Sequence, residues 1–210
     1  MSKIQEIAQA VETGKMKIVG GLVEAALAEG ADPVRILNEG MIGAMDIVGD
    51  KFKRSEIFVP EMLVAAKAMK KGVEVLKPRL TGEAGAGLGK CLIGTVAGDM
   101  HDIGKNLVAM MIESAGFEVI DLGVDISAEK FIDALRKNSD TKLLALSALL
   151  TTTMPAMKQI IEAIKAADLK SFKIIVGGAP ITADYAKQIG ADGYAPDAAS
   201  AAALAKQLAA

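Results

Sequence analysis

The 210-residue sequence predicts an α/β protein in two parts, an N-terminal four-helix bundle and a C-terminal five-stranded parallel sheet. Three observations support this fold class. Apolar residues recur at helical spacing through residues 1–80. A glycine-rich stretch, TGEAGAGLG, follows at residues 81–89. From residue 90 onward, short apolar runs alternate with amphipathic segments, roughly 25 residues from one run to the next.

The N-terminal part is expected to contain four helices joined by short connections, which favours a compact antiparallel bundle. The clearest start signal is Asp32-Pro33, with Asp as the N-cap and Pro as the first helical residue. This third helix is expected to run toward Phe52. The fourth is expected to start near Val59 and to end at Pro78.

Residues 81–89 are expected to form a flexible linker, because no side chain there can build a core. A phosphate-binding loop is the alternative. It is disfavoured because the G-x-x-x-x-G-K-[ST] pattern is incomplete and the stretch precedes a strand instead of following one.

The C-terminal part reads as five βα repeats, which predict a parallel sheet of the flavodoxin-like, doubly wound class. The expected strands are CLIGTVA at 91–97, FEVIDLG at 117–123, KLLALSAL at 142–149, FKIIVGG at 172–178 and ADGYAP at 191–196. The expected helices lie near 103–115, 127–138, 154–167, 181–189 and 197–208. Ligands of this class bind at the carboxyl ends of the strands, so the residues just after each run matter most.

Composition excludes several functions. The 24 basic and 26 acidic residues are nearly balanced, which argues against general nucleic-acid binding. No apolar run reaches the ~20 residues of a membrane helix, so neither nucleic acid nor membrane is an expected partner. Cys91 is the one cysteine and excludes an internal disulfide. A lone thiol and the lack of a signal-like N-terminus fit a cytoplasmic protein.

His101 is the only histidine of the chain and follows the first predicted strand, in the sequence Asp99-Met100-His101. A carboxylate two positions earlier can hydrogen-bond one ring nitrogen and leave the other as a basic lone pair. One histidine cannot build an ordinary zinc or iron site. A metal bound here must bring its own ligands, as a corrin does with four equatorial nitrogens. The alternative is a structural histidine.

Small residues follow two later strands. Ser147-Ala148-Leu149 ends the third run, and Gly177-Gly178 ends the fourth. They leave room for a ligand between the strand ends. A capping hydroxyl at Ser147 and a plain turn at the two glycines are the alternatives.

Together these residues resemble the vitamin B12-binding domain of the base-off, His-on type. Its signature of D-x-H-x-x-G, S-x-L and G-G is matched in order by residues 99–104, 147–149 and 177–178. The resemblance extends to MDIVGDKF at 45–52 and IFVPEM at 57–62, which are similar to the helical cap of methyl-transferring corrinoid proteins. That family includes the cobalamin module of methionine synthase and the corrinoid proteins of methanol, methylamine and methoxyarene systems. It implies a cap at 1–80, a linker at 81–89 and a B12-binding domain at 90–210.

The resemblance implies the site residues as well. His101 is expected to be the axial ligand of cobalt, with Asp99 hydrogen-bonded to it and Thr153 continuing a proton relay. Phe52, Val59 and Met62 are expected to cover the upper face of the cofactor, with bundle core as the alternative. The remaining expected cofactor contacts are Asp102, Ile103, Gly104, Ser147, Leu149, Thr151, Gly177 and Gly178. Among these, Ser147, Leu149, Gly177 and Gly178 would line the slot for the dimethylbenzimidazole tail.

The function implied is that of a methyl carrier without catalysis of its own, in anaerobic one-carbon metabolism. Its cobalamin cobalt(I) would accept a methyl group through a donor-specific methyltransferase and pass it on, as methyl-cobalt(III), to a second methyltransferase. The second enzyme would use tetrahydrofolate or a thiol such as coenzyme M, and a reductive activator would serve the corrinoid. The sequence does not identify the methyl donor.

Four other functions fit the sequence less well. A receiver domain needs an aspartate after the third strand, where this chain has Ser147, and a nicotinamide dehydrogenase needs G-x-G-x-x-G in the first βα turn. A B12-dependent sensor would add an output domain to the cap and the B12 fold, which account for all 210 residues. The B12-binding subunit of a mutase shares D-x-H-x-x-G but would not need a helical bundle.

Overall fold

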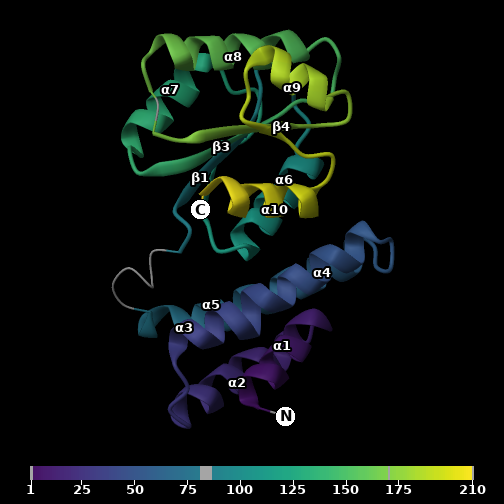
Figure 1. Cartoon of the computed structure of the whole chain (residues 1–210), viewed down its shortest axis with the longest axis vertical. Coiled ribbons are helices and arrows are strands. Elements are labelled where there is room, and N and C mark those ends of the chain that lie inside the picture. The colour runs from purple at the N-terminus through teal and green to yellow at the C-terminus, as the bar shows by residue number, and fades with distance from the viewer. Residues whose placement is uncertain (1, 81–86, 170, 210) are drawn as a thin grey trace. The chain divides into compact units, whose positions relative to one another are not determined.

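The computed structural model describes residues 2–80, 87–169 and 171–209 and divides them into two compact units (Figure 1). The helical unit comprises the chain up to Gly87 together with Ser114–Gly116. The α/β unit comprises Leu88–Glu113 and Phe117–Ala210. Most of the expected linker, residues 81–86, lies outside the described residues, so the linker and the domain limits derived from it stay predictions.

Helices with short connections form the helical unit, as the sequence pattern predicts. They are α1 (Lys3–Glu12), α2 (Met16–Ala28), α3 (Pro33–Arg35), η1 (Ile36–Ile42), α4 (Gly43–Lys53), α5 (Val59–Leu76) and η2 (Lys77–Arg79). The first helix begins at a capping box, in which the Ser2 hydroxyl accepts from the Gln5 amide and the Gln5 side chain accepts from the Ser2 amide. The fourth predicted helix begins at Val59, with Pro60 in its first turn.

The core of this unit is aliphatic and methionine-rich. Its fully buried side chains include Ile7, Val11, Val19, Val23, Ile36, Met41, Met62 and Leu76. Gly72 of α5 permits a close approach, because a Cβ atom there would lie 2.7 Å from Met41 Cε and 2.9 Å from Val19 Cγ1. Replacing this glycine would therefore displace core side chains.

The third predicted helix differs from a regular α-helix. Its start is as predicted, since the Asp32 side chain accepts from the Val34 amide and Pro33 is in the first turn. Seven residues, Ile36–Ile42, then wind as a π-helix before α4 continues. The wider turn passes close to α1, where a Cβ atom on Gly40 would lie 3.3 Å from Ile7 Cγ2. Apolar periodicity does not distinguish such a segment from an α-helix.

The α/β unit contains five parallel strands alternating with five helices. They are β1 (Lys90–Thr95), α6 (Ile103–Ser114), β2 (Glu118–Asp121), α7 (Ala128–Lys137), β3 (Thr141–Ser147), α8 (Met154–Ala166), β4 (Lys173–Gly177), α9 (Ala183–Ile189), β5 (Gly193–Tyr194) and α10 (Ala198–Ala209). The strand order is β2-β1-β3-β4-β5. This order places α7, α8 and α9 on one face of the sheet and α6 and α10 on the other (Figure 1). The predicted fold class, a helical segment followed by a five-stranded parallel sheet, is confirmed.

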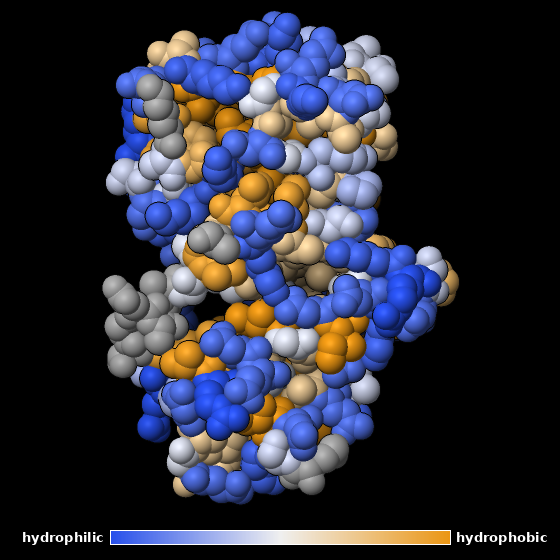
Figure 2. Space-filling model, in the orientation of Figure 1, coloured by the Kyte–Doolittle hydropathy of each residue, from blue (hydrophilic) through white to orange (hydrophobic). Residues whose placement is uncertain are grey.

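A hydrophobic core cluster lies between the sheet and helices α7, α8 and α9. Strand residues such as Leu92, Leu144 and Val176 pack there with Phe131 and Met157. A Cβ atom on Gly94 of β1 would lie 2.8 Å from the Phe131 ring, so only glycine leaves room for that ring. Figure 2 shows mainly hydrophilic residues on the visible outer surface of this unit, with apolar residues exposed among them.

The last strand is shorter than the apolar run at 191–196 suggests. Only Gly193 and Tyr194 pair with β4 as an edge strand, opposite Ile175 and Val176. Gly193 faces α10, because a Cβ atom there would lie 2.8 Å from Leu204 Cδ2. Within the described ranges, none of the helices combines the length and hydropathy required to cross a membrane.

Candidate functional site

The carboxyl ends of the three central strands align at one edge of the sheet. Thr95, the last residue of β1, is the register partner of Ser147 at the end of β3. Ser147 is in turn the partner of Gly177 at the end of β4. Residues far apart in the chain are thereby brought side by side, as the parallel topology predicts.

Asp99 is the structural centre of this edge. It lies in the loop between β1 and α6 and is completely buried. Its carboxylate accepts five hydrogen bonds from two loops, from the His101 amide (3.1 Å), His101 Nδ1 (2.7 Å), the Leu149 amide (2.7 Å), the Leu150 amide (3.3 Å) and Thr153 Oγ1 (2.7 Å). One carboxylate therefore joins the loop after β1 to the loop after β3.

Electrostatics favour the ionised form of Asp99. Burial alone would raise the pKa of this carboxyl. The hydrogen bonds from the Leu149 amide, the Thr153 hydroxyl and His101 outweigh burial and hold its pKa well below the usual range. Asp99 is thus a carboxylate at neutral pH and acts only as an acceptor.

The imidazole of His101 is oriented by that carboxylate. Because ionised Asp99 cannot donate, the 2.7 Å contact assigns a proton to His101 Nδ1, and in the neutral imidazole this leaves the lone pair on Nε2. Among the described residues, no hydrogen bond engages Nε2, and the side chain is 51% exposed. The backbone is fixed as well, since Thr95 Oγ1 donates to the His101 carbonyl oxygen at 2.8 Å. The ring thus presents a lone pair to solvent above the sheet edge, as a metal-binding histidine does.

Thr153 completes a line of polar groups. Its hydroxyl lies 2.7 Å from Asp99 Oδ2 and 2.9 Å from the Leu150 carbonyl oxygen, and the residue is buried just before α8. The single hydroxyl proton lies between two acceptors. The geometry expected of the Thr153–Asp99–His101 relay is present, and its role in proton movement stays a prediction.

Large apolar side chains are exposed around His101. Met100 is 68% exposed, Ile103 is 85% exposed, and Leu149 and Leu150 are each 42% exposed. Exposed aliphatic groups at a strand edge are typical of a ligand-binding surface. Ile103 and Leu149 were expected as cofactor contacts. Met100 and Leu150 were not, although apolar residues beside D-x-H and S-x-L are a signal that could have identified them.

The two glycines at the end of β4, Gly177 and Gly178, are required by the backbone. Gly178 has φ 126°, and a Cβ atom there would lie 1.8 Å from the Ala148 carbonyl oxygen. A Cβ atom on Gly177 would lie 3.1 Å from the Ala195 carbonyl oxygen. The strand ends therefore approach each other closely at this point. The expected slot for a cofactor tail, lined by Ser147, Leu149 and these glycines, stays a prediction.

The remaining expected contacts in the α/β unit are exposed. Asp102 accepts from Asn106 Nδ2 at 3.1 Å and so braces the first turn of α6. A Cβ atom on Gly104 would meet nothing within 4 Å, which leaves the surface there open. Thr151 lies in the exposed turn before α8.

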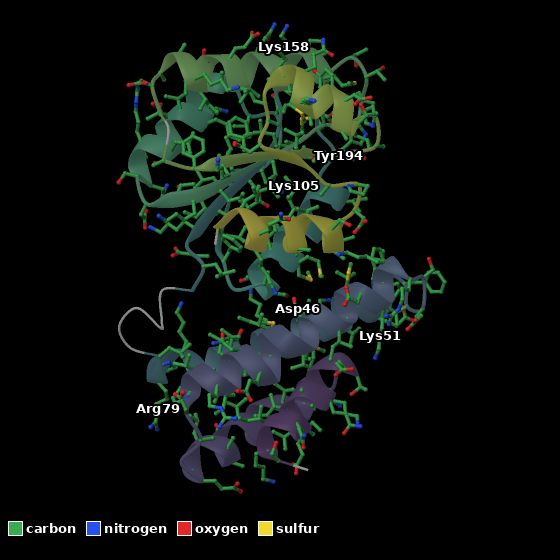
Figure 3. The ribbon with its side chains drawn as sticks, viewed as in Figure 1. Asp46, Lys51, Arg79, Lys105, Lys158 and Tyr194 are labelled. Atoms are coloured by element: carbon green, nitrogen blue, oxygen red, sulfur yellow. The ribbon has the colours of Figure 1, made fainter. Side chains whose placement is uncertain are left out.

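An ion pair between a buried lysine and a partly exposed aspartate supports the same loop and was not expected from the sequence. Lys105 Nζ contacts Asp121 Oδ2 at 2.5 Å and Asn106 Oδ1 at 2.7 Å. The side chain of Lys105 is 1% exposed and that of Asp121 is 40% exposed. In Figure 3 Lys158 extends away from α8, whereas Lys105 lies inside the α/β unit. The pair ties the first turn of α6 to the end of β2.

The expected cap residues lie in the helical unit. Phe52 is partly buried at the end of α4, and Val59 is 39% exposed at the start of α5. Met62 is fully buried. Their contact with the upper face of a cofactor stays a prediction.

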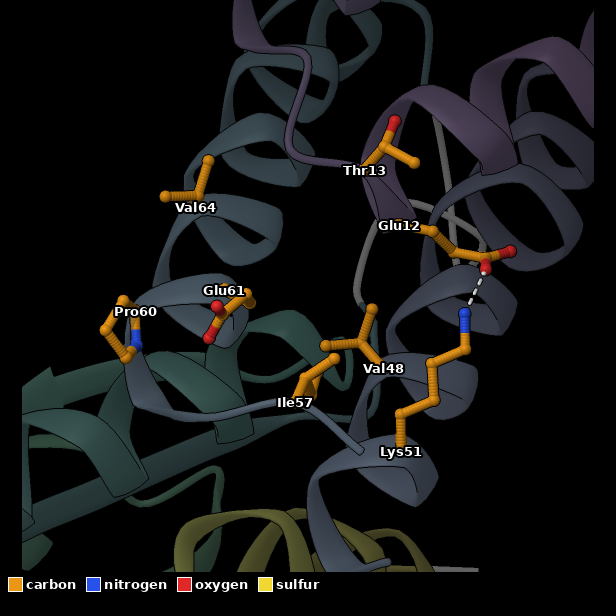
Figure 4. A pocket seen from close by; sticks show the side chains of 8 residues that line it. All are labelled: Glu12, Thr13, Val48, Lys51, Ile57, Pro60, Glu61 and Val64. Carbon is orange, nitrogen blue, oxygen red and sulfur yellow. Dashed lines mark hydrogen bonds and ion pairs between the residues drawn. The ribbon is translucent and has the colours of Figure 1, made fainter. Parts of the chain in front are cut away.

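A separate cavity of about 370 Å³ opens in the helical unit (Figure 4). Its lining residues are Glu12, Thr13, Val48, Lys51, Ile57, Pro60, Glu61 and Val64. Lys51 Nζ lies 3.1 Å from Glu12 Oε2, an ion pair that joins α4 to α1 across one side of the cavity. None of the expected site residues lines it.

The residues at the sheet edge fit a corrin. No cluster of three or more His, Cys, Asp or Glu side chains that could hold a metal ion occurs within residues 2–80, 87–169 and 171–209. The edge instead offers one oriented imidazole surrounded by aliphatic side chains. A flat metal macrocycle that supplies its own equatorial ligands matches this donor set.

Comparison with known proteins agrees with the site. B12 binding domain families match residues 89–203 and residues 3–77. A corrinoid protein of Desulfitobacterium hafniense is 40% identical over 212 residues, covering 99% of this chain and 98% of its own. Dimethylamine corrinoid protein 1 of Methanosarcina acetivorans is 43% identical, with 98% and 96% covered. The structure of the methanol:cobalamin methyltransferase complex of Methanosarcina barkeri superposes with a TM-score of 0.86 at 30% identity, covering 99% of this chain and 79% of the other.

The fold, the site and these matches define a cobalamin-binding protein. More particularly, the chain belongs to the family of corrinoid proteins of the methylamine and methanol methyltransferase systems.

Proposed function

We propose that this protein is a methyl carrier that holds its corrinoid in the base-off, His-on form, with His101 Nε2 as the axial ligand. The observation that carries this proposal is the line of hydrogen bonds from Thr153 through buried Asp99 to His101 Nδ1. It leaves a basic lone pair on the exposed side of the ring, at the edge where ligands of this fold class bind.

When bound, the corrinoid supplies a cobalt centre that accepts and releases a methyl group. The protein supplies control of the axial bond. Asp99 stabilises the proton on Nδ1 and thereby increases the basicity of Nε2. A shift of that proton toward Asp99 Oδ1 would give the imidazole more anionic character and strengthen its donation. The Thr153 hydroxyl, bonded to Oδ2, would balance the charge on the carboxylate.

The other expected residues receive binding roles in this proposal. Met100, Ile103, Leu149 and Leu150 would pack against the ring around the axial ligand. The smaller residues at the ends of β3 and β4, Ser147, Gly177 and Gly178, would line the slot for the displaced tail. Asp102, Gly104 and Thr151 would contact the polar periphery, and Phe52, Val59 and Met62 would form the cap over the methyl-bearing face.

As a carrier without its own substrate site, the protein would depend on partner enzymes. The relatives named for dimethylamine and for methanol support a donor-specific methyltransferase as the first partner. A second methyltransferase would deliver the methyl group to tetrahydrofolate or a thiol, and a reductive activator would return the cofactor to its active state. A B12-dependent sensor or a mutase subunit is the alternative.

The ligand assignment is tested by reconstituting the purified protein with hydroxocobalamin and recording its visible spectrum. Wild type is expected to show a His-on spectrum and His101→Ala a base-off spectrum. Glu129→Ala, an exposed change at the start of α7, is the matched control and should behave as wild type. Identical spectra for wild type and His101→Ala would contradict the assignment.

The carrier role is tested by methyl transfer under reducing conditions. The reduced holoprotein is mixed with a dimethylamine or a methanol methyltransferase and its substrate, and the methylated spectrum is followed. Methylation by one of the two supports the carrier role and identifies the donor class. No methylation with either one would exclude dimethylamine and methanol as its methyl donors.

A further inference from the structure

Asp125 has an unusual backbone conformation near the site. It lies in the loop between β2 and α7, with φ 53°. Residues other than glycine rarely adopt this left-handed region, and Asp and Asn are among those that tolerate it best. Such conformations persist where the surrounding structure holds them, often close to functional groups. Neither the D-x-H-x-x-G motif nor the other two signature motifs includes Asp125.

The contacts of Asp125 converge on the loop that carries His101. Its carboxylate Oδ1 accepts from the Gly98 amide at 2.7 Å. Its own amide donates to the Asp99 carbonyl oxygen at 3.0 Å. Asp125 therefore holds the Gly98–Asp99 segment at both ends, through the Gly98 amide as donor and the Asp99 carbonyl oxygen as acceptor.

The neighbouring contacts continue this attachment. The Ile126 amide donates to the Thr95 carbonyl oxygen at 3.0 Å, and Val96 and Ile126 form a parallel bridge. The Asp99 amide closes a turn onto the Val96 carbonyl oxygen, and Gly98 has φ 80° as the third residue of that turn. The turn at residues 96–99, just before His101, is thus held both by a hydrogen bond to the end of its own strand and by contacts with the loop after β2.

The consequence concerns the direction of the Asp99 side chain. Both of its oxygens have defined partners, which lie in two different loops. A small rotation of the Gly98–Asp99 backbone would move the carboxylate away from His101 Nδ1 or from the Leu149 amide. Among the described residues outside that turn, Asp125 forms hydrogen bonds with the backbone on both sides of the Asp99 Cα atom. These bonds are to the Gly98 amide and to the Asp99 carbonyl oxygen.

We propose that Asp125 is a positioning residue for the axial ligand: by holding Gly98 and Asp99, it keeps the Nδ1–H group of His101 hydrogen-bonded to Asp99 and directs Nε2 toward the cofactor. The inference rests on the proposed axial role of His101. Asp125 itself does not touch the imidazole. It acts through two backbone hydrogen bonds and through its capacity for a positive φ.

Three substitutions separate these two contributions. Asp125→Asn keeps a side-chain oxygen as acceptor and tolerates positive φ. Asp125→Gly favours positive φ but removes the acceptor. Asp125→Ala loses both. A positioning role through the side chain predicts that Asn is close to wild type, that Gly is impaired, and that Ala is impaired further.

The first measurement uses the protein without cofactor and depends only on His101. Because the chain has one histidine, selective ¹⁵N-histidine labelling gives a single pair of imidazole nitrogen signals. Wild type and Asp125→Asn are expected to show the Nδ1–H tautomer, and Asp125→Gly a mixture of tautomers. Thermal unfolding of each variant shows whether its fold is kept.

The second measurement uses the reconstituted protein. Loss of a residue that supports a metal ligand weakens metal binding by about 10- to 100-fold. Asp125→Gly is therefore expected to bind hydroxocobalamin about tenfold more weakly and to show a smaller His-on fraction at fixed pH. The Asn variant should restore both.

The proposal is overturned if Asp125→Gly keeps the wild-type tautomer and affinity, or if Asp125→Asn is impaired as much as Asp125→Gly. Failure of the axial assignment is distinguishable from both results. In that case wild type and His101→Ala give the same holoprotein spectrum, while the imidazole signals of the cofactor-free protein still report whether Asp125 orients the ring.

Discussion

At the scale of the residue, the site depends on a buried carboxylate that organises its neighbours. Asp99 collects five donors from two loops. The motif D-x-H predicts its bond to His101. It does not predict the bonds to Leu149, Leu150 and Thr153, because those residues lie 50 to 54 positions away in sequence and reach Asp99 only when β1 and β3 pair.

The first prediction concerns the pH dependence of Asp99 in the protein without cofactor. The pKa of Asp99 is depressed in the folded protein, so this group adds stability that is fully present above its unfolded pKa of about 3.9 and is lost as pH falls toward the folded pKa. The free energy of unfolding of wild type should therefore fall more steeply below about pH 5 than that of Asp99→Asn. At pH 7 the variant should be less stable by about 2 kcal/mol or more, since an amide nitrogen would face buried donors. Denaturant unfolding across pH checks this, and parallel curves would contradict it.

The second prediction compares two glycines of the signature motifs. Gly178→Ala forces a Cβ atom into the Ala148 carbonyl at a positive φ and should cost about 2 kcal/mol or more of unfolding free energy. Gly104→Ala, in the first turn of α6 with open space around it, should be neutral or stabilise by up to about 1 kcal/mol. Chemical denaturation of the cofactor-free variants gives both values. Equal changes in unfolding free energy for the two variants would contradict this prediction.

At the scale of the element, α6 is anchored where it leaves the site. The Lys105–Asp121 pair joins its first turn to β2, although a cation near a helix N-terminus opposes the helix dipole. This arrangement had no counterpart in the sequence pattern, because periodicity predicts the helix but not which polar residue it buries. The π-helical segment Ile36–Ile42 is a comparable case in the helical unit.

The third prediction follows from the unequal burial of that pair. Asp121→Asn leaves a buried ammonium beside a neutral amide and should destabilise by about 3 kcal/mol. Lys105→Met removes the buried charge and leaves a carboxylate that is 40% exposed, so its cost should be smaller. The double variant should be close to Lys105→Met. Unfolding free energies of the three proteins decide the matter, and a larger loss in Lys105→Met than in Asp121→Asn would contradict the account.

The fourth prediction uses β1, which carries the only cysteine. Cys91 is fully buried, and burial raises the pKa of its thiol to about 12. The thiolate is the reactive form, so iodoacetamide at pH 8 should leave the native protein unmodified and label it after unfolding. Mass spectrometry before and after denaturation measures the label. Rapid labelling of the native protein would show that β1 opens or that Cys91 is not buried in the core.

At the scale of the whole molecule, much of the architecture was predictable. Five βα repeats, the strand-end location of the signature motifs and the helical segment before them appear in the structure. The apolar run at 191–196 predicted a longer strand than the structure contains, since only Gly193 and Tyr194 pair at the sheet edge. The bracing by Asp125 and Lys105 was not predictable, because it depends on loops that meet only after the sheet forms.

The central claim is that His101 Nε2 is the axial ligand of the corrinoid. The most direct measurement is electron paramagnetic resonance of the cobalt(II) holoprotein after selective ¹⁵N-histidine labelling, because His101 is the only histidine. If this ring is the axial ligand, natural ¹⁴N splits each cobalt line into three. Labelling with ¹⁵N is then predicted to split each line into two. In His101→Ala the nitrogen splitting is predicted to disappear. A threefold splitting that survives labelling would mean that the tail base of the cofactor ligates the cobalt, and would contradict the account.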